Sequence, residues 1–314
     1  MLDRNHYCMS ATAFGLDGRI DEDAMRRFFL RSLDARLGLY IGSGGNGEGH
    51  ALEPDELGQI YRIGVEVSRG RFPVHANLPE QHTAKATIAQ AKIAVDAKID
   101  VIHMYTLEGR HNMVPNDAEL IAYYDDVLEV IQHPVCVCVN NAMGYVPKAL
   151  TVAEICRRHQ QVVAVRLSHQ PELYLYDIRE NVGRDLAYYF QLATGVMQPL
   201  MIGATIFSQE ANILPKTVRQ LVDLYAAGKQ DQMAGPFLDM MRFRRYVGRW
   251  APAGPRWIKM AMRVLKLPGG EGGVRRPYLL PPQAELDSFL DGLLRLRIPE
   301  IDEMARAAGL TIPA

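Results

Sequence analysis

One charged side chain, Arg166, ends the otherwise apolar run VVAVRLSHQ at residues 162–170. A buried guanidinium is costly unless an anion meets it. Arginine binds carboxylates in a bidentate manner and stabilises enolates or oxyanions, but it does not act as an amine nucleophile. We therefore predict that Arg166 holds an anionic group of a small molecule, with Ser168 contacting the same molecule.

The segment GSGGNGEG at residues 42–49 is a second candidate for binding an anion, because five of its eight residues are glycine. Such a loop can turn its backbone N–H groups inward as a nest for a carboxylate or phosphate, although a tight turn between strand and helix has the same composition. It lacks the Gly-Lys-Ser/Thr ending of a Walker sequence. We expect Gly44, Gly45, Asn46 and Gly47 to hold a carboxylate.

Other polar side chains follow other apolar runs. Asn140 and Asn141 come after PVCVCV, and Ser208 comes after ATIF. We expect these three to contact a substrate. Glu108 together with Arg110 suits a general acid/base and anion-binding pair, and it equally suits a surface ion pair.

The histidines and cysteines are expected to be structural. His75, His103 and His111 lie in the same region as Glu108, but their spacing matches neither HxH nor HExxH. We therefore predict no metal and no cofactor. Cys138 has no histidine near it in the sequence, so we expect it to pack in the core rather than act as a nucleophile.

Apolar runs of strand length alternate with amphipathic helical patterns over the first two thirds of the chain. The eight predicted strands are 7–13, 37–42, 73–77, 101–105, 135–139, 162–167, 189–193 and 204–207. Capping residues mark the starts of the predicted helices between the strands. Examples are Asp21 before the helix at 24–35, Thr83 before the helix at 84–98, and a Thr151/Glu154 capping box before the helix at 155–159. Eight such units predict an α/β fold, a (β/α)₈ TIM barrel whose chemistry lies at the C-terminal ends of the strands.

After Gly228 the strand pattern stops, and helices are predicted at 232–246, 256–265, 282–296 and 301–308. The Gly/Pro-rich stretch 267–282 is predicted to be a loop. We therefore expect the barrel to span residues 1–228 and a C-terminal helical appendage, packed on the barrel, to span residues 229–314.

The composition is that of a globular protein and argues against several classes of partner. The chain has 314 residues, 48% of them hydrophobic, with a formal net charge of -1 and a pI of about 6.8. The two signs of charge are interspersed, which argues against nucleic acid or an anionic membrane as partner. The four cysteines form no CxxC motif, and no run of about 18 apolar residues occurs. We expect a reduced, cytoplasmic protein.

Several segments together resemble one known family. GNGEGHAL resembles the Gly-Thr-Thr-Gly-Glu loop of the dihydrodipicolinate synthase and N-acetylneuraminate lyase superfamily, and GATIFSQEANILPK at 203–216 is similar to its Gly-Ala-x-Gly-x-Ile-Ser-x-x-x-Asn-x-x-Pro segment. The opening SATAF and the tail RRPYLLP match as well, so the resemblance is collinear over essentially the whole chain. It implies a barrel fold and a homotetramer or homodimer.

The resemblance also implies catalytic residues that this chain does not have. The family uses a lysine at the end of strand six as a Schiff base with pyruvate, and Arg166 stands at that position. The family's tyrosine after strand five aligns with Cys138 or Val139. Lys148 and Tyr145, in the loop after strand five, are candidates for the missing amine and phenol, but a solvated lysine and a surface or interface tyrosine are the simpler interpretations.

These observations predict a lyase, either carbon–carbon or hydro-lyase, that binds a small carboxylate or 2-oxo acid. Arg166 would stabilise an enolate-type intermediate without Schiff-base chemistry, and Glu108 would be the acid/base. Ordinary dihydrodipicolinate synthase activity is not expected. The alternative is a catalytically inactive homologue that binds carboxylates or serves as a scaffold.

Overall fold

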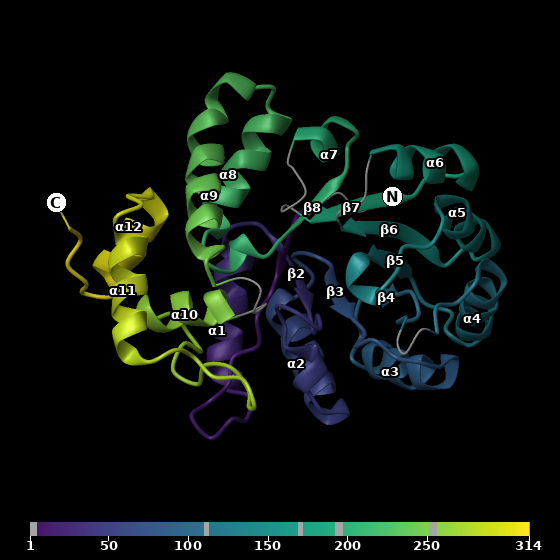
Figure 1. Cartoon of the computed structure of the whole chain (residues 1–314), viewed down its shortest axis with the longest axis horizontal. Coiled ribbons are helices and arrows are strands. Elements are labelled where there is room, and N and C mark those ends of the chain that lie inside the picture. Colours follow the sequence, from purple (N-terminus) through teal and green to yellow (C-terminus); the bar gives the residue numbers. More distant parts are fainter. Residues whose placement is uncertain (1–4, 110–112, 169–171, 192–196, 251–255, 314) are drawn as a thin grey trace.

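The computed structural model describes residues 5–109, 113–168, 172–191, 197–250 and 256–313 (Figure 1). At its centre, eight parallel strands form a closed barrel in which each strand pairs with the next and β8 pairs with β1. The strands are β1 (Tyr7–Met9), β2 (Gly38–Ile41), β3 (Val74–Asn77), β4 (Val101–Tyr105), β5 (Val135–Asn140), β6 (Val162–Ser168), β7 (Ala187–Gln191) and β8 (Thr205–Ser208). The predicted (β/α)₈ barrel is confirmed.

A helix follows each strand and covers the outside of the barrel (Figure 1). These helices are α1 (Glu22–Asp34), α2 (Pro54–Ser68), α3 (Ala84–Asp96), α4 (Asp117–Val130), α5 (Ala149–Arg158), α6 (Glu172–Val182), α7 (Met197–Met201) and α8 (Pro215–Ala226). Predicted caps occur at α1, where Asp21 accepts the Ala24 N–H at 2.9 Å, and at α3, where Thr83 accepts the Ala86 N–H at 3.2 Å. These side chains satisfy N–H groups that the first helical turn leaves unpaired.

One predicted helix start is wrong. Thr151 was expected to cap a helix starting at 155, but α5 already begins at Ala149 with Lys148 as the capping residue. The reason is a tertiary contact, because the Thr151 hydroxyl donates to Asp117 of α4 at 2.8 Å. The Thr/Glu spacing therefore lies inside the helix and makes no capping box.

The barrel interior is filled by side chains that alternate with those facing the helices. Tyr7 and Phe207 stack at 4.7 Å between ring centroids, and Tyr40 meets Phe207 edge to face at 5.3 Å. This interior cluster consists of Tyr7, Met9, Tyr40, Val101, Cys136, Cys138, Ala164, Ala187, Tyr189 and Phe207, with Tyr105 and Val163 packed against it. Because packed aromatic side chains fill the interior, we expect the functional site at the C-terminal ends of the strands.

The last part of the chain is helical, with α9 (Ala234–Val247), α10 (Arg256–Val264), α11 (Gln283–Leu294) and α12 (Pro299–Ala307). Figure 1 shows α10 to α12 in yellow-green and yellow, beside α1 and α9. Their apolar side chains share a core with Phe28 of α1 and with Ile213 and Leu214, which precede α8. The boundary at residue 228 stays a prediction.

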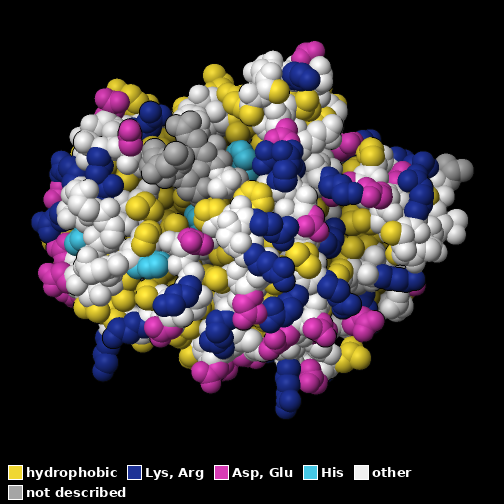
Figure 2. Space-filling view, turned by 180° about the vertical axis from the view of Figure 1, so that it is seen from behind, with side chains coloured by type: hydrophobic (Ala, Val, Ile, Leu, Met, Phe, Trp, Pro, Cys, Tyr) yellow, Lys and Arg dark blue, Asp and Glu magenta, His cyan; other side chains and the backbone are white. Residues whose placement is uncertain are grey.

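The surface agrees with the charge pattern of the sequence. Figure 2 shows basic and acidic side chains mixed over the face seen from behind. Among the described residues, none of the helices has the length and apolar character needed to cross a membrane.

Candidate active site

Three neighbouring strands bring Tyr105, Cys138 and Arg166 to the same level of the barrel. Tyr105 of β4 is in register with Cys138 of β5, and Cys138 is in register with Arg166 of β6. Residues in register on parallel strands point to the same side, here the interior. A phenol, a thiol and a guanidinium are therefore side by side near the C-terminal ends of these strands.

Arg166 is 1% exposed and stays charged inside the barrel. Its Nη2 donates to the Tyr105 hydroxyl, and its guanidinium carbon lies 4.7 Å from the Tyr40 ring centroid and 5.2 Å from that of Tyr105. Burial alone would lower the pKa of Arg166, but the acidic groups of Tyr105 and Tyr40 outweigh it and hold this pKa well above its ordinary value.

The guanidinium also has unused hydrogen-bonding capacity. Its Nε and Nη1 are buried and make no hydrogen bond to any described group. Within the described part of the chain, no carboxylate forms an ion pair with Arg166 either. Buried donors usually have partners, so a cation in this state is suited to an incoming anion.

Tyr40 is held in place under the guanidinium. Its hydroxyl donates to Asn77 Oδ1, and the backbone oxygen of Asn77 in turn accepts from the Tyr61 hydroxyl at 2.7 Å. Burial raises the pKa of Tyr40 and of Tyr105, so both phenols stay protonated near neutral pH. Each can donate a hydrogen bond.

The glycine-rich loop is fixed by short contacts. Thr12 donates to the Gly47 oxygen at 2.6 Å, and the Gly47 N–H donates to Ser43 at 3.1 Å. Glycine is required at 49, because a Cβ there would lie 2.1 Å from the Gly42 oxygen. Of the predicted carboxylate-binding residues, Asn46 and Gly47 are buried, whereas Gly44 is partly exposed and Gly45 is exposed.

A carboxylate of the protein itself faces this loop. A Cβ on Gly44 would lie 2.8 Å from Glu80 Oε2, in the loop after β3. Burial raises the pKa of Glu80, nearby Glu108 raises it further, and the charge of Arg166 opposes the shift. Glu108 is 15% exposed, and its Oε2 lies 3.9 Å from His82 Nε2. The two glutamates therefore share one side of the site, and the sequence singled out only Glu108.

The remaining predicted substrate contacts divide into two groups. Asn140 and Ser168 are in register with each other at the ends of β5 and β6, on the same side as Arg166. Asn141 is exposed. Ser208 follows the interior residue Phe207, so it faces the helices, where it donates to Glu210 at 2.9 Å and accepts the Ala211 N–H at 3.1 Å. The structure therefore gives Ser208 a local capping role.

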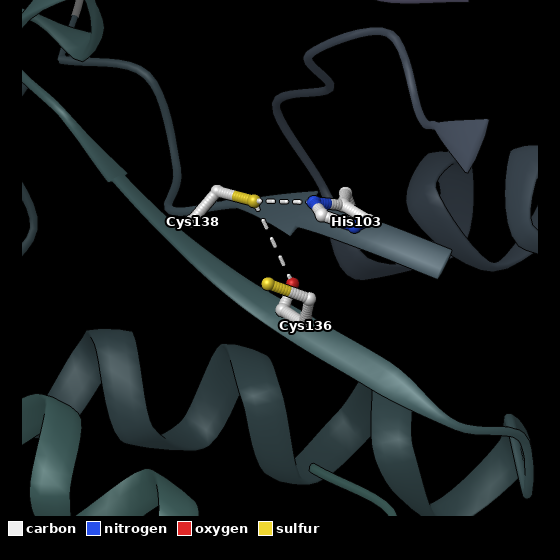
Figure 3. Close-up of side chains that lie close together, drawn as sticks. All are labelled: His103, Cys136 and Cys138. Atoms are coloured by element: carbon white, nitrogen blue, oxygen red, sulfur yellow. Dashed lines mark hydrogen bonds between the residues drawn. The ribbon is translucent and has the colours of Figure 1, made fainter. Parts of the chain in front are cut away.

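Cys138 packs in the barrel interior as expected, but a histidine that is distant in the sequence lies beside it. Cys138 Sγ is 3.5 Å from His103 Nδ1 (Figure 3). On its other side, His103 Nε2 is 2.8 Å from His75 Nδ1. Burial raises the pKa of the Cys138 thiol, but Cys136 and Arg166 outweigh it, and this pKa lies below the ordinary thiol value. The site thus contains an ionisable sulfur.

His103, Cys136 and Cys138 also have a spacing that can suit metal ligands, with their donor atoms within 4.8 Å of one another. The set considered from the sequence, His75, His103, His111 and Glu108, was different and predicted no metal. Arg166 already supplies a positive charge beside Cys138, and a second cation at this place would be repelled. We assign no metal here.

Lys148 and Tyr145 are the residues considered as replacements for the family's lysine and tyrosine. Lys148 is 75% exposed and pairs with Asp117, as a solvated loop lysine does. Tyr145 packs against Gly109, in the loop after β4, and its hydroxyl is buried rather than on the surface. Arg110 and His111, together with the predicted strand end at Ala193, lie outside the described residues.

Comparison with known proteins agrees with the barrel fold. A sequence profile described as "Dihydrodipicolinate synthetase family" matches residues 5–289. The chain belongs to this family. Members of the dihydrodipicolinate synthetase family are lyases, which supports the lyase class.

Two curated relatives illustrate the range of the family. The chain is 25% identical over 279 residues to the 4-hydroxy-tetrahydrodipicolinate synthase of Chlorobium phaeovibrioides, covering 86% of this chain and 88% of that one. It is 28% identical over 146 residues to a Streptomyces coelicolor protein named "Probable 5-dehydro-4-deoxyglucarate dehydratase 1", covering 46% of this chain and 44% of that one.

Solved structures of the family have the same fold. YagE, a prophage protein of E. coli K12 solved in complex with pyruvate, superposes with a TM-score of 0.82 at 18% identity, covering 93% of this chain and 98% of that one. A family protein from Coccidioides immitis gives 0.81 at 19% identity, covering 99% and 100%. These likenesses concern the fold.

Proposed function

We propose that this family member binds a small 2-oxo acid against Arg166 and acts as a lyase through an enolate stabilised by that guanidinium. The observation that carries the proposal is the pair of buried, unpartnered nitrogens Nε and Nη1 on Arg166. A 2-oxo acid offers a carboxylate and a carbonyl oxygen, and both can accept from a guanidinium. When negative charge develops on the carbonyl oxygen, the same donors stabilise it.

The Tyr105 hydroxyl completes this oxyanion site. It accepts from Arg166 Nη2, which leaves its own proton to point at the substrate oxygen. The second anionic position is the loop at Asn46 and Gly47, on the other side of the barrel mouth from β6. Glu80 and Glu108 lie on that side, and we propose them as the groups that exchange protons with the substrate.

The lysines support a reaction without a Schiff base. The chain has eight lysines, and none of them lies on a strand of the barrel in the described residues. The buried Lys259 belongs to α10, where its Nζ pairs with Glu48 at 3.0 Å and donates to the Gly273 oxygen at 2.8 Å. A guanidinium stays protonated and cannot form the iminium, so Arg166 has an electrostatic role.

The alternative is an inactive homologue that binds the same acids without turnover. Both functions use Arg166, so binding alone does not separate them. The active protein must exchange or release substrate atoms, which is seen as deuterium entering C3 of pyruvate in D₂O. Binding without exchange or product over a panel of 2-oxo acids favours the scaffold. The homotetramer or homodimer stays a prediction of the resemblance.

Ligand-dependent thermal unfolding tests the proposal. Because a ligand that binds only the folded state stabilises it by RT ln(1 + [L]/Kd), we expect pyruvate and larger 2-oxo acids to raise Tm in a saturable manner. At about 100 times Kd the gain is about 2.7 kcal/mol. Neutral ketones of the same size are the control and should leave Tm unchanged. Equal shifts with acids and neutral ketones would contradict an anion site.

A further inference from the structure

Four acidic side chains surround the buried guanidinium, and one of them differs from the others. They are the phenols of Tyr40 and Tyr105 and the thiols of Cys136 and Cys138. The pKa values of Tyr40, Tyr105 and Cys136 are raised by burial, whereas that of Cys138 is lowered. Of these four side chains, Cys138 is therefore the one that loses its proton first as the pH rises.

The position of Cys138 gives it two neighbours that matter. It is in register with Arg166 on the adjoining strand, and its sulfur lies 3.5 Å from His103 Nδ1. His103 Nε2 lies 2.8 Å from His75 Nδ1, so a hydrogen-bonded pair of histidines ends at the sulfur. Figure 3 shows the thiol pointing toward the histidine ring.

The buried positive charge of Arg166 must be balanced by a negative charge. Arg166 is 1% exposed, and within the described residues no carboxylate pairs with it, so its charge needs an anion from elsewhere. A buried site tolerates one paired charge much better than a net charge. A thiolate at Cys138 can supply that anion when the site holds no ligand, and an arriving carboxylate or enolate then makes the thiolate superfluous.

We propose that Cys138 is the resting counter-ion of Arg166 and that it takes up one proton when an anionic ligand binds to Arg166. The ligand replaces the thiolate as the partner of the guanidinium, and the sulfur takes up one proton from the solvent. The net charge of the barrel interior is unchanged, and no bond to carbon forms or breaks. Cys138 is thus a positioning residue, and the inference rests on the proposed anion site.

The coupling makes ligand affinity depend on pH in a defined direction. Above the pKa of Cys138 each pH unit leaves about ten times less protonated thiol, so the affinity for pyruvate should fall by about tenfold per pH unit. Other groups facing the thiol are Arg166, His103, Cys136, Tyr40, Tyr105 and Glu80, with Tyr124 behind it on α4. Burial raises the pKa values of the phenols, of Cys136 and of Glu80, so the comparison with Cys138→Ser is needed to assign the pH dependence to the thiol.

The test measures pyruvate affinity by calorimetry from neutral to alkaline pH in the full-length protein. We expect the native protein to lose affinity as the pH rises. Cys138→Ser should keep binding but lose the pH dependence, so that it binds more tightly than the native protein at alkaline pH. Cys156→Ser, which removes a buried cysteine outside the barrel interior, should keep the native slope. An unchanged slope in Cys138→Ser would overturn the inference.

A second measurement needs no ligand and separates this inference from the proposed function. The ultraviolet absorbance of thiolate should titrate below the ordinary thiol pKa of about 8.5 in the native protein, and this step should vanish in Cys138→Ser. If pyruvate and related acids fail to bind, the proposed function fails and this titration decides the inference alone. A Cys138 thiol that ionises only at or above the ordinary value would overturn it, as would a metal ion that is retained through Cys138.

Discussion

Arg166→Met is expected to remove the response to 2-oxo acids while leaving the fold at least as stable as the native chain. The loss follows because methionine has no donor for a carboxylate or oxyanion. Loss of one preorganised donor costs enzymes about 10²- to 10³-fold, and we expect at least that loss in pyruvate affinity or turnover. Stability is expected to hold because the change removes a buried charge and, within the described residues, leaves no carboxylate unpaired, while the Cys138 thiol can take up a proton.

Thermal unfolding with and without pyruvate checks both halves of this result. Arg166→Met should unfold at or above the native Tm and show no shift with ligand. Arg184→Met is the contrasting variant, because Arg184 donates to the backbone oxygens of Cys156, His159 and Val162 at 2.6–2.9 Å. It should lower Tm and keep the ligand response. A native pyruvate response in Arg166→Met would contradict the role given to this guanidinium.

Breaking the buried ion pair between Glu48 and Lys259 is expected to give the largest loss of stability. Glu48 Oε1 lies 3.0 Å from Lys259 Nζ, and the two side chains are 2% and 0% exposed. Lys259 also donates to the backbone oxygens of Thr12 and Gly273, and the Arg275 N–H donates to Glu48 at 2.9 Å. Removing one partner leaves a buried charge, so Lys259→Met or Glu48→Gln should cost about 3–5 kcal/mol.

The same pair joins the glycine-rich loop to α10, so the loss should also weaken binding at the site. Urea unfolding measures the stability, and the double variant should lose less than the sum of the singles. Lys216→Met is the matched control. Lys216 Nζ pairs with Glu303 Oε1 at 2.6 Å, and the two side chains are 63% and 60% exposed. That exposed pair should contribute less than about 1 kcal/mol. A similarly small loss in Lys259→Met would contradict the account of the loop.

The barrel could be predicted because its periodicity is local. Each strand is an apolar run, and each helix has a cap or an amphipathic face, so eight repeats were visible without any contact information. Where a contact between distant residues decided the outcome, the prediction failed. Thr151 is drawn to Asp117 of α4, and helix α5 therefore begins earlier than the capping pattern indicated.

The sequence predicted the buried cation of the site, Arg166, but not the side chains that surround it. Arg166 stood out because a charge in an apolar strand is costly. Tyr40 and Tyr105 did not, since a tyrosine in a strand has a normal β propensity and gives no signal. Counting alternate residues to the end of β4 would have placed Tyr105 in the interior. The contact between Cys138 and His103 joins different strands, and only the register supplies it.

The central claim is that a 2-oxo acid is held at Arg166 without a covalent bond to a lysine. Borohydride reduction in the presence of pyruvate, followed by intact-mass and peptide analysis, tests it most directly. We predict that the native protein keeps its unmodified mass at pyruvate concentrations that saturate the Tm shift. Arg166→Lys, which restores an amine where the family resemblance expects one, serves as the positive comparison. A reduced pyruvate adduct on Lys148, Lys259 or any other native lysine would contradict the account.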